Sequence, residues 1–117
     1  SFPRRSYQWG NGWISNNIDT EILIWIYDEE FSDKSIECKL VIHSEKMKEI
    51  IISKVLYSGN SYTFKVSEIF RNAEINCPKE KVPIYWNFVH EKVRSETFSI
   101  IKVSNQGENF IAGEHGY

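Results

Sequence analysis

The feature of this chain that most constrains its fold is a strict two-residue alternation over residues 35–43. Apolar side chains stand at every second position, with mostly polar ones between them: Ile36, Cys38, Leu40 and Ile42 against Glu37, Lys39 and Val41. Successive side chains of a strand point to opposite faces, so this period predicts a strand with one buried and one exposed face. The phase turns Cys38 inward, where we expect a small hydrophobic side chain rather than a reactive thiol.

Other segments also have the character of short strands separated by turns. Residues 20–27 form a continuous apolar run that is too short for an average helix, which predicts a central strand buried on both faces. Residues 47–57 and 62–66 flank the turn signal Ser58-Gly59-Asn60-Ser61 and predict a hairpin. Further strand signals follow at residues 82–90, 97–103 and 109–113. No segment keeps the 3.6-residue period of a long helix.

Length and composition agree with an all-β fold. The chain has 117 residues, enough for one hydrophobic core, and its 4 Trp, 6 Tyr and 7 Phe suit a pleated surface. Seven or eight short strands with regularly spaced turns predict a single antiparallel β-sandwich, immunoglobulin-like or jelly-roll-like.

The first 19 residues differ from the rest, since they are rich in Gly, Asn, Ser and aromatic side chains. We expect residues 1–19 to form an irregular arm, or a short edge strand with tight turns, packed on a sandwich domain made by residues 20–117. Exposed Trp and Tyr rings stack on sugars and anchor protein partners, so the arm supplies a candidate ligand-binding site: Trp9, Asn11, Trp13, Asn16 and Asn17. The alternative is that these Trp rings fill the end of the core. Trp25 and Trp86, in mid-strand, are expected in the core or on a sheet face.

Catalytic and cofactor signatures are missing from the sequence, which has no phosphate loop, nucleophile elbow, zinc-ligand spacing or dinucleotide fingerprint. The chain is therefore expected to be a non-catalytic binding or adaptor domain without a cofactor, recognising a protein partner or a carbohydrate. One alternative stays open. If the fold brings their strands together, His90, Glu114 and His115 could ligate a metal and make the domain a metal-binding β-barrel with scope for enzymatic activity.

Charge and hydropathy narrow the range of partners. A formal net charge of −2 gives no attraction to nucleic-acid phosphates. The longest apolar run, residues 22–27, is far shorter than the roughly 20 residues of a membrane helix, so no membrane insertion is expected. Self-association through unpaired edge strands is a further expectation.

The N-terminal residues and the cysteines indicate the expected cellular compartment of the protein. Residues 1–5 are not followed by the apolar stretch of a leader, and the 2 Cys have no CxxC spacing, which favours reduced thiols and a cytoplasmic location. Export after removal of a leader is the alternative. Whether Cys38 and Cys77 pair is left open by the sequence.

Several short motifs occur in a fixed order: Ile14-Ser15-Asn16 before Thr20 and a strand, an acidic turn at Asp28, the alternating strand from Ile36, Val66-Ser67-Glu68-Ile69-Phe70 followed by Cys77-Pro78, and Val82-Pro83-Ile84. This order resembles that of the sensory rhodopsin transducer family of small β-sandwich proteins. The resemblance implies a β-sandwich and a cytoplasmic oligomer that binds another protein or a small ligand. Where the family has a run of Gln, His, Thr and Arg, this chain has Trp86-Asn87-Phe88-Val89-His90, so no functional residue is carried over.

Overall fold

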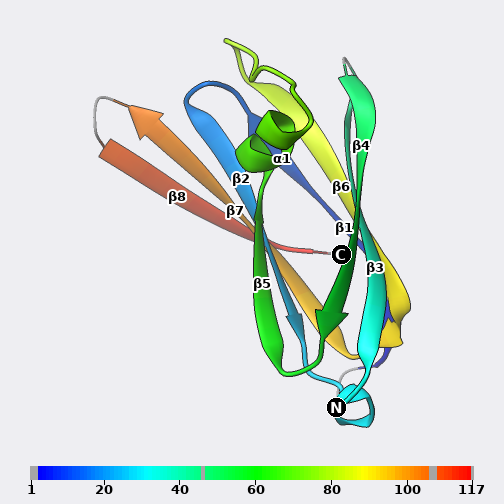
Figure 1. Ribbon diagram of the computed structural model, residues 1–117. Coiled ribbons are helices and arrows are strands. Elements are labelled where there is room, and N and C mark those ends of the chain that lie inside the picture. Colours follow the sequence, from blue (N-terminus) through cyan, green and yellow to red (C-terminus); the bar gives the residue numbers. More distant parts are fainter. Residues whose placement is uncertain (1–2, 46, 106–107, 117) are drawn as a thin grey trace.

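The computed structural model of the protein describes residues 3–45, 47–105 and 108–116, which form two antiparallel sheets packed face to face (Figure 1). Sheet I has the strand order β1-β6-β3-β4, and sheet II has the order β5-β2-β7-β8. The strands in these ranges are β1 (Arg5–Ile14), β2 (Ile18–Ile26), β3 (Ser35–Ser44), β4 (Met47–Tyr57), β5 (Asn60–Lys65), β6 (Val82–Val93), β7 (Ser95–Asn105) and β8 (Glu108–His115). A short 3-10 helix, η1 (Glu29–Phe31), and one α-helix, α1 (Val66–Asn72), connect them. The predicted all-β sandwich is confirmed.

The core lies between the sheets and contains the alternate side chains of each strand. Among its most deeply buried members are Ile22, Ile24, Ile36, Leu40, Ile42, Ile84, Trp86 and Phe88. The inward face predicted for residues 35–43 is the face that the core contains. Cys38 is buried on it, and burial raises the pKa of its thiol to about 12, which makes this cysteine an unreactive core side chain. β2 is central, as predicted, but Trp25 is 50% exposed, so only one face of that strand is buried.

Of the two expectations for residues 1–19, the edge strand is the one that forms, and it is longer than expected: β1 is an edge of sheet I. β1 pairs with β6 over residues 7–14. The glycines of β1 let neighbouring side chains pack closely against its backbone, and they do not form tight turns. A Cβ atom added to Gly10 would lie 2.4 Å from Cζ2 of Trp86, so only glycine lets the indole pack directly against the β1 backbone. Because β1 pairs with β6 as the edge strand of sheet I, the segment is part of the sandwich and not a separate arm packed on it.

The hairpin predicted from residues 47–57 and 62–66 does not form. β4 pairs with β3 in sheet I, whereas β5 pairs with β2 in sheet II, so the chain crosses between the sheets at the intervening turn (Figure 1). In that turn Gly59 adopts a φ of +87°, and its N–H donates to the carbonyl of Ile26 at 2.7 Å. This bond to the end of β2 directs β5 onto sheet II. Within the described residues no helix is long and apolar enough to cross a membrane.

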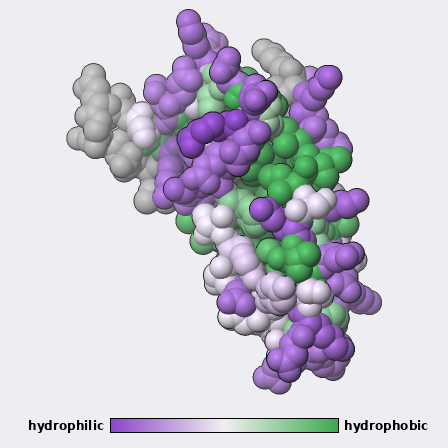
Figure 2. Space-filling view, viewed as in Figure 1, coloured by the Kyte–Doolittle hydropathy of each residue, from purple (hydrophilic) through white to green (hydrophobic). Residues whose placement is uncertain are grey.

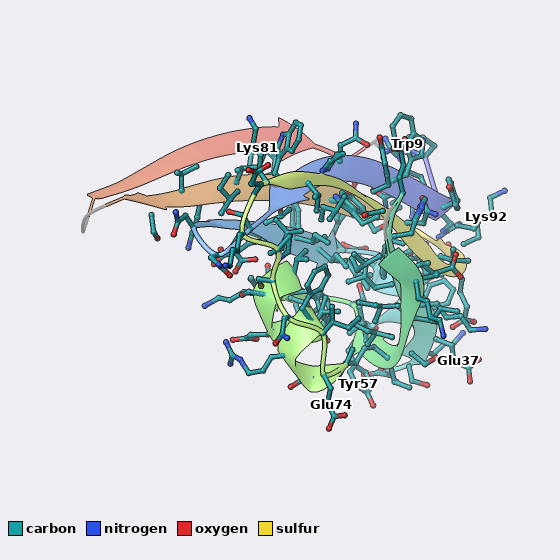
Figure 3. The ribbon with its side chains drawn as sticks, turned by 90° about the horizontal axis from the view of Figure 1, so that it is seen from above. Trp9, Glu37, Tyr57, Glu74, Lys81 and Lys92 are labelled. Atoms are coloured by element: carbon teal, nitrogen blue, oxygen red, sulfur yellow. The ribbon has the colours of Figure 1, made fainter. Side chains whose placement is uncertain are left out.

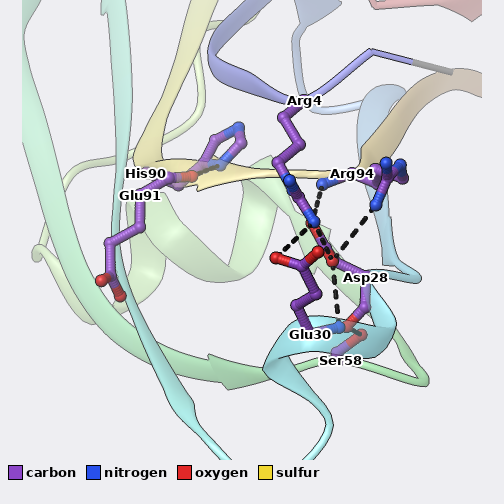
Figure 4. A network of polar contacts seen from close by, with 7 residues as sticks. All are labelled: Arg4, Asp28, Glu30, Ser58, His90, Glu91 and Arg94. Atoms are coloured by element: carbon purple, nitrogen blue, oxygen red, sulfur yellow. Dashed lines mark hydrogen bonds and ion pairs between the residues drawn. The ribbon is translucent and has the colours of Figure 1, made fainter.

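A buried carboxylate, Asp28, joins several turns at one end of the sandwich (Figure 4). Arg4 Nε donates to it at 2.7 Å, and the main-chain N–H groups of Arg94 and Glu30 donate at 3.0 and 3.2 Å. The hydroxyl of Ser58 donates to the Asp28 carbonyl at 2.8 Å. The hydrogen bond from Arg4 and those from the main chain hold the pKa of Asp28 well below its usual range, against the opposing effect of burial. The carboxylate of Asp28 thus fixes the N-terminal segment and the β6–β7 turn, and its main-chain carbonyl fixes the β4–β5 turn.

Replacing Asp28 with asparagine is expected to lower the free energy of unfolding by about 2 kcal/mol at neutral pH, because the charge-assisted hydrogen bonds from Arg4 and from the main chain are weakened. The depressed pKa of Asp28 also gives the wild-type protein stability that is present above about pH 4 and is lost as the pH falls further, where the unfolded chain takes up the proton more readily. Urea denaturation at neutral pH and at about pH 3 measures both effects.

The matched control is Asp33→Asn, at an exposed position shortly after η1, which should unfold like the wild type. Equal acid sensitivity of the Asp28→Asn variant and the wild type would contradict the role given to this carboxylate.

Candidate binding surface

The outward positions of β1 carry a row of aromatic side chains. Its even-numbered residues 8–14 are buried, and the odd-numbered positions point outward: Tyr7, Trp9, Asn11 and Trp13. Tyr7 is 50% exposed, Trp9 43% and Trp13 37%. Strand geometry separates the Cα atoms of the two Trp residues by about 13 Å. Figure 3 shows Trp9 pointing away from the interior of the sandwich. The Trp rings of β1 therefore do not fill the core.

The strand register places side chains of β6, β3 and β4 on the same face of sheet I as this row. Trp9 lies opposite Asn87 of β6, which lies opposite Val41 of β3. Val41 in turn lies opposite Ile51 of β4, and residues directly opposite one another share a face. Among the described residues, seven of the eight exposed large apolar side chains lie on this outer face of sheet I: Tyr7, Trp9, Trp13, Ile51, Val55, Tyr57 and Val89. The eighth, Trp25, lies on sheet II.

Contacts within the outer face of sheet I fix some of its rings. The Tyr7 hydroxyl donates to Oδ1 of Asn87 at 2.9 Å. The ammonium of Lys81 lies 4.7 Å from the centroid of the Trp13 ring, a cation–π distance that covers one side of the indole. Beyond them a hollow of about 550 Å³ interrupts the face, and its outward-facing lining includes Glu37, Lys39, Ser53, Val55, Val89 and Glu91. The face is thus partly ordered before anything binds to it.

Two residues of the predicted site lie elsewhere. Asn16 and Asn17 form the turn between β1 and β2 and line a separate polar cleft of about 490 Å³, together with Asp19, Ser67, Arg71 and Lys102 among others. The structure therefore brings Trp9, Asn11 and Trp13 onto one face but not the two asparagines. The tight turn directs those side chains to the end of the sandwich.

His90, predicted as an alternative metal ligand, belongs to a buried polar network between the sheets. Its Nδ1 lies 2.7 Å from the carbonyl oxygen of Glu91 (Figure 4), so this nitrogen carries the proton, since a carbonyl only accepts. Nε2 then accepts from the side-chain amide of Gln8 at 3.3 Å. The same amide donates to the Ser95 hydroxyl at 2.7 Å, and its oxygen accepts from the Thr97 hydroxyl at 3.1 Å. Both ring nitrogens of His90 are therefore engaged within the protein.

The other residues of the metal hypothesis gain no support. The side chains of Glu114 and His115 lie outside the described residues, and their backbones pair with β7 in sheet II, whereas His90 belongs to sheet I. In the part of the chain that the structure describes, no group of three or more His, Cys, Asp or Glu side chains is placed to hold a metal ion. Cys38 and Cys77 are both free thiols.

Comparison with known proteins bears on the fold. No protein-family model matches the chain, and a search of curated proteins found no match. A crystal structure of Thermotoga maritima 1070 superposes with a TM-score of 0.72, covering 96% of this chain and 92% of that one, at 11% sequence identity. At that identity the similarity shows a shared fold alone.

The outer face of sheet I also contains apolar residues that the sequence did not single out: Tyr7, Ile51, Val55, Tyr57 and Val89. A local signal existed only for Tyr7, which shares the odd-numbered phase of Trp9 and Trp13 along β1. The others come from β4 and β6, and strand register alone brings them beside the Trp row.

His90 gives the protein a second acid-sensitive step. Burial lowers the pKa of its ring, against the smaller opposing effect of the Glu91 carbonyl. Because the folded state disfavours the proton, the resulting stability is present above about pH 6.5 and is lost as the pH falls below it. We expect the free energy of unfolding to decline between about pH 7 and pH 5 in the wild type, and to decline less in His90→Gln. Urea denaturation across this range measures it, and identical slopes for the two proteins would contradict the assignment.

Proposed function

We propose that this chain is a non-catalytic binding domain that recognises a protein partner through the outer face of sheet I. The observation that carries the proposal is the concentration of exposed apolar side chains on that face. Aromatic side chains supply most of the binding energy at protein interfaces, where each anchors in a pocket of the partner. Trp9 and Trp13 are the leading candidates for such anchors, with Asn11 between them as a polar contact.

The size of the outer face of sheet I suits a protein interface. Four strands about 4.8 Å apart and at least ten residues long span roughly 630 Å² in projection. A standard interface buries about 800 Å² of accessible surface on each partner. Because protruding side chains raise the accessible area above the projected one, this face could supply most of a standard interface.

The mixture of side chains favours a protein over a carbohydrate. Sugars stack on flat aromatic rings, whereas Ile51, Val55 and Val89 are branched aliphatic side chains that pack best against other apolar side chains. One side of the Trp13 ring is already covered by Lys81. These features leave Tyr7, Trp9 and Tyr57 as stacking platforms, a minority of the exposed apolar side chains of the face.

Two other observations agree with this proposal. The free thiols of Cys38 and Cys77 suit the reducing environment of the cytoplasm, which we propose as the compartment. Kinship with the sensory rhodopsin transducer family, which we also propose from the order of short motifs, would imply a domain that binds another protein or a small ligand.

The proposal predicts that loss of either Trp from the face weakens binding by roughly 10- to 30-fold, as expected for an interface hot spot. A photo-crosslinking amino acid at Asn11, between the two rings, captures what contacts the face in cells. Calorimetry with the purified captured protein then gives dissociation constants for the wild type, Trp9→Ala and Trp13→Ala.

Trp25→Ala is the matched control, since it removes an equally exposed indole from sheet II and should leave binding unchanged. Captured protein that binds all three variants as tightly as the wild type would overturn the proposal. Binding of a glycan array that is lost in Trp13→Ala, without any captured protein, would make the ligand a carbohydrate instead.

A further inference from the structure

The separation of β4 from β5 leaves an open groove along one side of the sandwich. β4 is an edge of sheet I and β5 is an edge of sheet II. The groove between them has a volume of about 470 Å³ and is lined by residues of both strands and of α1, among them Ile50, Ile52, Lys54, Phe64, Glu68 and Ile69. Figure 2 shows apolar surface in the region between α1 and β4.

The main chain of β4 presents hydrogen-bonding groups at this edge. The N–H of Tyr57 donates to the hydroxyl of Tyr62 in β5 at 2.9 Å, so the main-chain groups of Tyr57 point away from β3. The β3–β4 register is regular from Tyr57 back to Ile50, and main-chain direction alternates along a strand. The N–H and C=O groups of Ile51, Ser53 and Val55 therefore also point away from β3, and within the described residues they have no hydrogen-bond partner.

The side chains on the inner side of this edge are apolar except for one lysine. Ile50 and Ile52 are half-buried, and they face the half-buried Phe64 across the groove. Lys54 lies opposite the buried Cys38, so it belongs to the same inward phase, yet it is exposed. No carboxylate of the described residues lies within ion-pair distance of its ammonium. The groove thus combines the apolar side chains of Ile50, Ile52 and Phe64 with the unpaired cation of Lys54. Of its other charged lining residues, Lys65 pairs with Glu21 and Glu68 lies on α1.

We propose that this groove binds an extended acidic segment of a partner protein, which adds to sheet I as a fifth strand beside β4. The segment would pair with the main-chain groups of Ile51, Ser53 and Val55, as in strand addition to an exposed sheet edge. Its alternate apolar side chains enter the groove and cover Ile50 and Ile52. A carboxylate at one inward position pairs with the Lys54 ammonium.

An acidic segment fits this edge better than a second copy of the chain does. β4 carries Lys48 and Lys54 against the single acidic residue Glu49. Antiparallel pairing of two β4 strands centred on Ile51 would place Lys48 of each copy opposite Lys54 of the other, and edge lysines of this kind discourage self-pairing. The inference goes beyond the proposed function, because the groove contains neither Trp9 nor Trp13.

The test selects ligands from a phage-displayed library of random nine-residue peptides against the wild-type protein. Enriched sequences are expected to alternate apolar residues with others and to carry Asp or Glu at one position of the apolar phase. A synthetic peptide of the enriched sequence should bind Ser53→Pro at least about tenfold more weakly, because proline removes the central edge N–H. Since that N–H points away from β3, the β3–β4 ladder stays intact.

Ser53→Ala is the matched control and should bind the peptide like the wild type, whereas Lys54→Glu should weaken binding of the acidic peptide. Amide hydrogen exchange on the wild-type protein gives a readout that requires no variant. The peptide should slow exchange at Ile51, Ser53 and Val55 and leave Ile50 and Ile52 unchanged.

Three results would overturn the inference. The selection could yield no alternating consensus, or the peptide could bind Ser53→Pro as tightly as the wild type. The wild type could also prove to be a dimer that Ser53→Pro dissociates, which would assign the groove to a second copy. Trp9→Ala should bind the peptide normally, so failure here is distinguishable from failure of the proposed function.

Discussion

The structure depends on the two-residue period of its strands, which gives sheet I an apolar inner face and also places several exposed apolar side chains on its outer face. The inner face packs against sheet II around Trp86 and Phe88. The outer face carries Trp9, Trp13 and Val89 with no layer of the described chain over them. Burying apolar area is the main favourable term in folding and association. The same term that closes the sandwich therefore favours a further layer on sheet I, supplied by another molecule.

Polar groups hold the sandwich in the geometry that presents this face. At one end, Asp28 accepts hydrogen bonds from residues before β1 and after β6. Between the sheets, Gln8 connects His90 of sheet I to β7 of sheet II. Buried polar groups are costly unless their bonds are made, so such networks specify one arrangement of the strands. Since Gln8 lies between Tyr7 and Trp9, the network also fixes the start of the aromatic row.

The sequence predicts part of this structure and leaves the rest to nonlocal pairing. Residues 35–43 are predictable because their alternation is visible in hydropathy. β1 is not, because its inner positions hold Gln8, Gly10 and Gly12 while its outer ones hold aromatic rings. With glycine and a polar residue inward and aromatic side chains outward, the sequence of β1 resembles that of an irregular segment. The crossing between the sheets at Gly59 is equally hard to predict from the sequence. The residue types of a turn do not show whether the next strand joins the same sheet or the opposite one. Trp9, Asn11 and Trp13 are predictable as a group because they lie close together in one Gly- and Asn-rich aromatic segment, whereas most of the rest of the face comes from β4 and β6.

The central claim is that a partner covers the outer face of sheet I, and the indole N–H signals of the protein test it most directly. A soluble paramagnetic reagent should broaden Trp9, Trp13 and Trp25 in the free protein and leave the buried Trp86 sharp. With the partner bound, Trp9 and Trp13 should become sharp while Trp25 stays broad. Signals of Trp9 and Trp13 that remain broad in the complex would contradict the account, as would their protection in the free protein.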